Sequence, residues 1–130
     1  MRYLCLIYHD DGTLDALPAS EHDALARDAL DYRDVLRQGG HYIDSFLLQG
    51  VDTATTVRVR NGKVHISDGP VAETKEQMGG FYLIDARDLN EAIRLASRLP
   101  PARLGSIEVR PVSEIERERF AREGAGARKS

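Results

Sequence analysis

Residues 80–111, GFYLIDARDLNEAIRLASRLPPARLGSIEVRP, decide the fold because they contain one complete β-α-β unit. The apolar run that opens this stretch predicts a strand. Asp88, followed three residues later by Glu91, predicts a helix that begins with a reciprocal capping box. Pro100-Pro101 is expected to end that helix, and the alternating run from Ser106 predicts a second strand.

A second β-α-β unit precedes this one in the chain. Residues 2–8 are apolar on both faces, which is typical of a strand at the centre of a sheet. Residues 21–38 predict a helix that Gly39-Gly40 ends, and residues 42–48 predict the next strand. The apolar face of the helix consists of Leu25, Ala29, Tyr32 and Leu36. Two such units predict an α+β fold of the ferredoxin-like, split β-α-β type, with an antiparallel sheet and both main helices on one face.

A β-hairpin is predicted as an insertion between the two units. Residues 55–60 and 63–67 both alternate between apolar and polar side chains, and Asn61-Gly62 separates them. Asn-Gly favours a type I′ turn because both residues tolerate a positive φ. We therefore expect two short antiparallel strands joined by this turn.

The second face of the predicted sheet has no helix to cover it, although the central strands carry apolar side chains on both faces. A second copy of the chain would bury this face, so we expect a homodimer. The alternative is a short terminal helix, opened by Ser113 and Glu116, that folds under the sheet. We expect a single domain over residues 1–123 and a disordered tail over residues 124–130.

The composition is typical of a globular protein of one domain: 130 residues, 42% hydrophobic, 30% charged, with a net charge of −3. The single cysteine, Cys5, excludes an intramolecular disulfide and a Cys-rich zinc site. No apolar run reaches the length of a membrane span, and the N-terminus lacks the pattern of a signal peptide. We therefore expect a cytoplasmic protein with no membrane partner. The acidic net charge also disfavours nucleic acid as a partner.

The charge is distributed unevenly along the chain. Residues 9–34 contain eight acidic and two basic side chains and so sum to −6. This segment predicts a solvated helix face or, alternatively, a surface that attracts a basic partner. The four histidines have no metal-ligand spacing, and phosphate- and dinucleotide-binding motifs are absent, so we predict no metal site and no cofactor.

The segment from Asp68 to Gly80 is the densest group of ionisable side chains between two strands. Such a loop can hold ligand-binding groups, or its charged side chains can lock the loop. His9 adds a second candidate, because it follows the central strand in a stretch rich in carboxylates. We predict catalytic roles for Asp68, Glu73 and His9, and ligand-binding roles for Lys75, Glu76, Tyr82 and Arg110.

Residues 68–82, DGPVAETKEQMGGFY, resemble the signature of the YCII-related, DGPF-domain proteins. That signature is D-G-P-F-x-E-x-K-E followed by a strand that begins Gly-Gly-aromatic, and Val71 stands here in place of its Phe. The similarity extends over most of residues 2–112. It implies a ferredoxin-like, dimeric α+β barrel, in agreement with the two β-α-β units and the uncovered sheet face.

The resemblance implies less about activity. Relatives in the broader YCII family have a proposed His–Asp pair and include an enzyme that acts on chlorinated hydroxyquinones. That histidine belongs on the first helix, but the stretch around Asp28 contains none and His22 lies well upstream, so the pair is not carried over. DGPF proteins also resemble products often encoded beside alternative sigma factors, which suggests a regulatory or stress context.

Three hypotheses about function remain. The first is a small-molecule enzyme in which Asp68 or Glu73 acts as acid or base and Lys75 or Arg110 holds an anion. The second is a non-catalytic module that binds a ligand or regulates a partner. In the third, the loop only braces the dimer.

Overall fold

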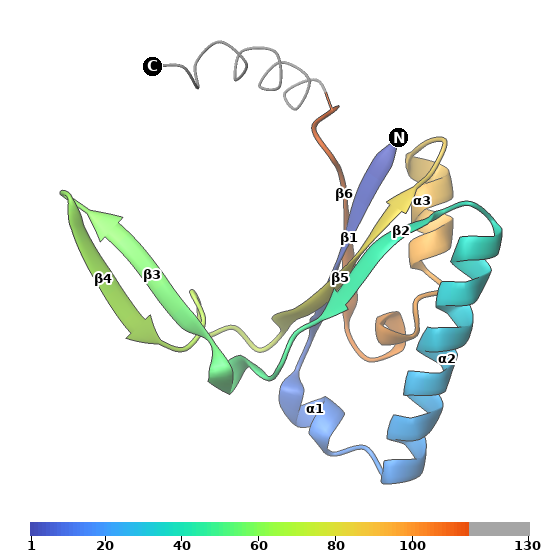
Figure 1. Ribbon diagram of the computed structural model, residues 1–130. Coiled ribbons are helices and arrows are strands. Elements are labelled where there is room, and N and C mark those ends of the chain that lie inside the picture. Colours follow the sequence, from blue (N-terminus) through green and yellow to red (C-terminus); the bar gives the residue numbers. More distant parts are fainter. Residues whose placement is uncertain (115–130) are drawn as a thin grey trace.

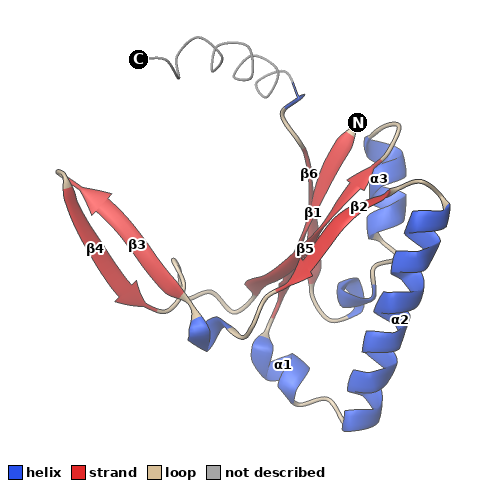
Figure 2. Cartoon of the chain, viewed as in Figure 1, coloured by secondary structure: helices blue, strands red, loops and turns tan. Residues whose placement is uncertain are grey.

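The computed structural model describes residues 1–114 and confirms the α+β prediction (Figure 1). A four-stranded antiparallel sheet has the order β2-β5-β1-β6, and two helices, α2 and α3, cover one of its faces (Figure 2). The strands are β1 (Arg2–His9), β2 (Tyr42–Leu47), β3 (Thr55–Arg60), β4 (Lys63–Asp68), β5 (Gln77–Asp85) and β6 (Ser106–Pro111). The helices are α1 (Asp11–Asp15), α2 (Ala19–Gln38) and α3 (Leu89–Ala96), with 3₁₀ turns at η1 (Val51–Thr53) and η2 (Pro100–Arg103).

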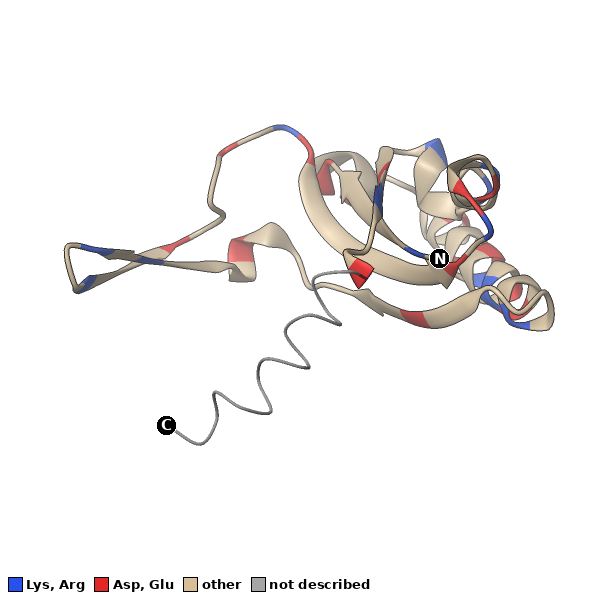
Figure 3. Ribbon diagram, turned by 90° about the horizontal axis from the view of Figure 1, so that it is seen from above, with Lys and Arg blue, Asp and Glu red and all other residues tan. Residues whose placement is uncertain are grey.

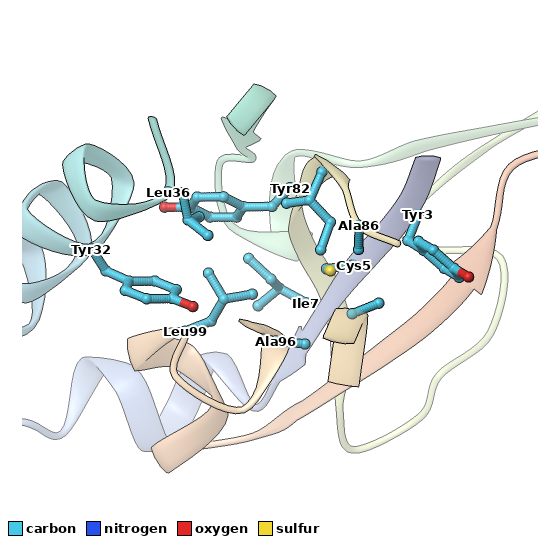
Figure 4. Close-up of a cluster of buried hydrophobic side chains, with 11 residues drawn as sticks. Tyr3, Cys5, Ile7, Tyr32, Leu36, Tyr82, Ala86, Ala96 and Leu99 are labelled. Carbon is cyan, nitrogen blue, oxygen red and sulfur yellow. The ribbon is translucent and has the colours of Figure 1, made fainter. Parts of the chain in front are cut away.

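The core lies between the sheet and the helices. Tyr3, Cys5 and Ile7 are buried along the helix-facing side of β1, as the alternation of a strand dictates. Tyr32 and Leu36 pack onto them from the C-terminal half of α2 (Figure 4). Burial raises the pKa of the Cys5 thiol to about 11. The thiol therefore stays protonated at neutral pH and packs as a small apolar side chain.

The N-terminus of α3 differs from the predicted capping box in one hydrogen bond. The Asp88 carboxylate accepts a 2.9 Å hydrogen bond from the backbone N–H of Glu91, as predicted. The Glu91 carboxylate, however, accepts from the backbone N–H of Arg87 at 2.9 Å rather than from that of Asp88. This bond, together with the Arg87 guanidinium, lowers the pKa of Glu91. The helix ends at Ala96, and Pro100 begins η2 instead of ending α3.

Two segment boundaries also differ from the sequence-based expectation. Asp10-Asp11-Gly12 favours a turn after β1 by its composition, but the structure has the helix α1 there, and Asp10 is its N-cap because its side chain accepts a hydrogen bond from the backbone N–H of Gly12. The predicted loop between the hairpin and β5 is shorter at both ends. Asp68 is the last residue of β4, and β5 begins at Gln77 rather than at Gly80.

The inserted hairpin is confirmed as a separate two-stranded sheet of β3 and β4. Asn61 and Gly62 have φ values of 53° and 76°, as a type I′ turn requires. Seen from above, the hairpin projects away from the rest of the molecule (Figure 3). We call residues 55–68 the arm, and the four-stranded sheet with its helices the body.

The second face of the body sheet carries apolar side chains that no element within residues 1–114 covers. Strand register places Leu4, Leu6, Phe81, Leu83 and Phe46 together on this open face. Phe46 is 57% exposed. The predicted terminal helix beyond Glu114 and the predicted tail at residues 124–130 lie outside the described residues. Within the described part, no helix is long and apolar enough to cross a membrane.

Candidate functional site

A cavity of about 480 Å³ is lined by the end of β1, by α1, by the N-terminal half of α2 and by the segment that follows β2. Most of its wall is apolar. Leu25 and Ala29 belong to the predicted core face of α2, but they are only half-buried and line this cavity instead. Further apolar lining comes from Ile7, Leu14, Leu47, Leu48, Val51, Met78, Pro101 and Leu104. An apolar wall with a few polar groups is the usual composition of a small-molecule site.

His9 and Asp11 form a polar pair in the wall of this cavity. His9 is the last residue of β1, and its side chain is 18% exposed. Its Nδ1 lies 3.3 Å from Oδ1 of Asp11, although the two atoms are not aligned as a hydrogen bond. The other oxygen of Asp11, Oδ2, accepts a 2.9 Å hydrogen bond from the backbone N–H of Val51. Asp11 is therefore held in place from the loop that follows β2 and faces the histidine.

Gly79 in β5 allows the imidazole to occupy this position. A Cβ built on Gly79 would lie 2.2 Å from Nε2 of His9, a distance that atoms do not tolerate. The ring thus lies directly over the bare backbone of this glycine. The described residues supply no hydrogen bond to Nε2, which leaves this nitrogen available to a ligand.

Tyr82, three exposed or half-exposed acids, a second histidine (His22) and the amides of Gln49 and Gln77 also belong to the polar part of the cavity. Tyr82 is 6% exposed and packs edge-on against Tyr42. Burial raises its pKa, so the phenol remains a neutral hydrogen-bond donor. Among the described lining residues, the carboxylates are Asp11, Asp15 and Asp52, and no side chain is Lys or Arg.

The structure brings together only two of the residues predicted for the site. His9 and Tyr82 both line the cavity. Tyr82 does so because it faces the helices, whereas Arg110 pairs with Leu4 and lies on the open face of the sheet. The other four predicted residues are elsewhere: Asp68, Glu73 and Lys75 are exposed outside the cavity, and Glu76 is half-buried beside β6.

Hydrogen bonds hold the loop between the arm and β5. The Gln77 amide donates to the carbonyls of Ala72 and Thr74, at 2.7 and 2.9 Å. No ion pair joins Glu73 to Lys75 in the described part of the chain. Hydrogen bonds therefore hold this loop, including those from Arg58 to the carbonyl of Val71 and from Ser106 to the carboxylate of Glu76, and an ion pair between Glu73 and Lys75 does not contribute.

A second hollow, of about 790 Å³, lies between this loop and the base of the arm. It is wide open to solvent. Glu76 contributes its one carboxylate among the described lining residues, which include Tyr8, Thr56, Pro70 and Met78. Its open shape makes it a poorer binding site than the cavity around His9, because a ligand there would stay largely hydrated.

Asp11 and Gly79 are residues of the candidate site that the sequence-based prediction missed. Asp10-Asp11-Gly12 suggests a turn, and only the capping role of Asp10 makes Asp11 the first residue of a helix. The available signal was a carboxylate two residues after the candidate His9, just past the end of a strand. No local pattern indicates that Gly79 lies under the imidazole, because that contact joins two strands far apart in the sequence.

Comparison with known proteins finds similarity over most of the length of this chain. The family model of the YCII-related domain matches residues 1–116. An uncharacterised protein of Rhizobium meliloti (strain 1021) is 36% identical over 115 residues, which cover 87% of this chain and 93% of that protein.

Proposed function

The chain belongs to the family of YCII-related domains, and we propose that it is a small-molecule enzyme in which His9 exchanges a proton with a ligand in the cavity. The observation that carries this proposal is the His9–Asp11 pair in a largely apolar cavity. A histidine beside a carboxylate is a common arrangement for general acid–base chemistry near neutral pH.

The two nitrogens of His9 have different roles in this proposal. Nδ1 directs its proton at Asp11, which orients the ring and stabilises the imidazolium that forms when the ring gains a proton. Nε2 then carries the lone pair that accepts a proton from the ligand. The 3.3 Å separation shortens into an aligned hydrogen bond when a ligand closes the cavity, as is common for catalytic pairs.

The charge of the cavity limits the ligand class. Three carboxylates and no Lys or Arg among the described lining residues disfavour a carboxylate or phosphate ligand. The apolar wall favours a carbon skeleton such as a single ring. We therefore propose a neutral or cationic ligand with an apolar body. Lys75 and Arg110, predicted to hold an anion, lie outside this cavity and have no contact with the ligand in this proposal.

The proton-acceptor role of His9 can be tested with 5-nitrobenzisoxazole, a neutral aromatic probe. Its ring opens when a base removes the proton on its C3 carbon and the N–O bond breaks, which releases a coloured phenolate. We expect His9→Ala to lower the rate by about 10²–10⁴-fold, the usual contribution of a general base. Asp11→Asn should lower it as well, because the ring loses its orienting carboxylate.

His65→Ala is the matched control, because it removes an exposed imidazole from the arm and should leave the rate unchanged. Equal rates for the wild-type protein and His9→Ala would contradict catalysis by His9. If the probe still binds in that case, the alternative of a non-catalytic ligand-binding module replaces the enzyme.

We also propose that the protein acts in the cytoplasm as a homodimer. Burial of the open sheet face supports association, since its apolar side chains are uncovered by the described residues. The single free cysteine, Cys5, supports a reducing compartment.

A further inference from the structure

Tyr82 has a buried phenol that bonds to no other group in the described part of the chain. Its side chain is 6% exposed, and no described residue donates to its oxygen or accepts from it. Tyr32 is equally buried, but its hydroxyl donates to the carbonyl of Leu95. The hydroxyl of Tyr42 shares a 2.8 Å hydrogen bond with Ser45. A buried phenol usually has a partner, so a group from outside the described residues is expected to accept from Tyr82.

The phenol oxygen of Tyr82 opens into the cavity around His9. Figure 4 shows the ring directed from β5 towards α2, and Tyr82 belongs to the cavity wall together with Ala29 of that helix. Within residues 1–114, the buried side-chain polar atoms without a partner are Nδ1 of His9 and Nε of Arg33. The Tyr82 oxygen is not one of them although it has no partner, so it is in contact with open space. It can therefore donate to a molecule in the cavity.

His9 and Tyr82 lie at two ends of this cavity. Tyr82 pairs with Cys5 in the register of β1 and β5, and His9 follows Cys5 by four residues on the same side of β1. Four residues of strand correspond to about 13 Å. Strand side chains stand roughly perpendicular to the sheet, so their functional groups are separated by a comparable distance. A ligand that contacts both residues must therefore be an extended molecule and not a small ion.

The two ends of the cavity differ in their electrostatic preference. The three carboxylates of the described wall belong to α1 and η1, the elements next to His9. At the other end, burial raises the pKa of Tyr82, and the nearby guanidinium of Arg33 on α2 opposes this effect. Arg33 forms no ion pair with any residue that the structure describes. The His9 end thus favours a positive charge, and the Tyr82 end favours an atom with a negative partial charge.

We propose that Tyr82 determines specificity in this cavity by donating a hydrogen bond to an oxygen or nitrogen acceptor at the far end of the ligand. The ligand class is then an apolar ring with a neutral or cationic group at the His9 end and an uncharged acceptor opposite to it. This inference rests on the proposed site around His9 and adds the contact that orients the ligand there. A single ring with one short side chain and a hydrogen bond at each end is about 12 Å long, which matches the separation of the two ends.

Benzylamine and 4-(aminomethyl)pyridine test this contact, because they have the same shape and differ in one ring atom. Both carry an ammonium group for the acidic end. Only the pyridine has an acceptor nitrogen at the opposite end of the ring, and this nitrogen is uncharged at mildly alkaline pH. In calorimetric titration of the wild-type protein, the pyridine should have a dissociation constant about 3–10-fold lower than benzylamine, the usual net contribution of one hydrogen bond. In Tyr82→Phe this preference should disappear.

Tyr32→Phe is the matched control, because Tyr32 is as buried as Tyr82 but its hydroxyl is bonded to Leu95. This variant should keep the preference for the pyridine and unfold at a lower urea concentration, since a hydrogen bond of the fold is lost. Tyr82→Phe should unfold at the wild-type urea concentration or above it, because it removes a polar atom without a partner. Equal destabilisation by the two substitutions would assign the Tyr82 hydroxyl to the fold and overturn the inference.

Three further results would overturn the inference, and they separate its failure from that of the proposed enzyme. Equal affinities of the wild-type protein for the two amines would exclude Tyr82 from recognition, and the role of His9 would stand if His9→Ala still slows the opening of 5-nitrobenzisoxazole. A preference for the pyridine that persists in Tyr82→Phe would assign the acceptor to another donor. If neither amine binds the wild-type protein, the ligand site around His9 fails together with this inference.

Discussion

Gly79→Ala is expected to abolish proton transfer by His9 while the protein stays folded. The new Cβ would lie 2.2 Å from Nε2 of His9, so the imidazole must leave its position beside Asp11. The rate of 5-nitrobenzisoxazole opening should fall to that of His9→Ala, about 10²–10⁴-fold below wild type. Because a side chain and not the backbone must move, the free energy of unfolding should fall by less than about 1.5 kcal/mol.

Gly80→Ala is the control for this prediction, because its clash is with backbone. A Cβ there would lie 2.5 Å from the carbonyl oxygen of Phe46 in the neighbouring strand β2. We expect a loss of about 1–3 kcal/mol in the free energy of unfolding, measured with urea. A Gly79→Ala protein with the wild-type rate would show that His9 does not accept the proton.

Ile84→Ala is expected to cause the largest loss of stability in the body. Ile84 is 1% exposed and lies on β5 between its neighbours Tyr3 on β1 and Tyr42 on β2. Removing three carbon atoms here loses apolar burial and leaves a cavity, so the free energy of unfolding should fall by about 2–5 kcal/mol. Urea denaturation at one fixed protein concentration measures this change, since association of copies contributes to the apparent stability.

Two substitutions calibrate that measurement. Ile84→Val should cost about 0.5–1.5 kcal/mol, because one methylene group is lost. Ile93→Ala removes the same atoms from a side chain that is 50% exposed on α3 and should cost less than Ile84→Ala. Equal losses for Ile84→Ala and Ile93→Ala would contradict the assignment of Ile84 to the core.

Local sequence signals account for the elements that were predicted. The Asn61-Gly62 turn and the Asp88 cap depend on backbone geometry within a few residues, and both are present. The boundary of β4 was misplaced because Asp68 pairs with Thr55 across the hairpin, a contact outside any local pattern. The bond of Glu91 has a different cause: its carboxylate accepts from the backbone N–H of Arg87, one residue before Asp88, and the capping-box pattern does not distinguish these two neighbouring N–H groups.

The candidate site was harder to predict because distant segments form it. The Asp11 carboxylate is oriented by a hydrogen bond from the backbone of Val51, forty residues away. The His9 imidazole fits in its position because Gly79 has no side chain. The dense group of ionisable side chains that includes Glu73 and Lys75 favours a binding loop in the sequence. In the structure these two side chains are exposed and form no ion pair with each other. Burial and a shared cavity decide where chemistry can occur, and neither follows from local composition.

The location and charge preference of the cavity can be measured by nuclear magnetic resonance with benzylamine and benzoate. The two probes share a phenyl ring and differ in the sign of their charge. Benzylamine should shift the backbone amide signals of Gly79 and Val51, which line the cavity, and benzoate should leave them unchanged. Shifts confined to Glu73 and Lys75, or equal responses to both probes, would contradict a ligand site around His9.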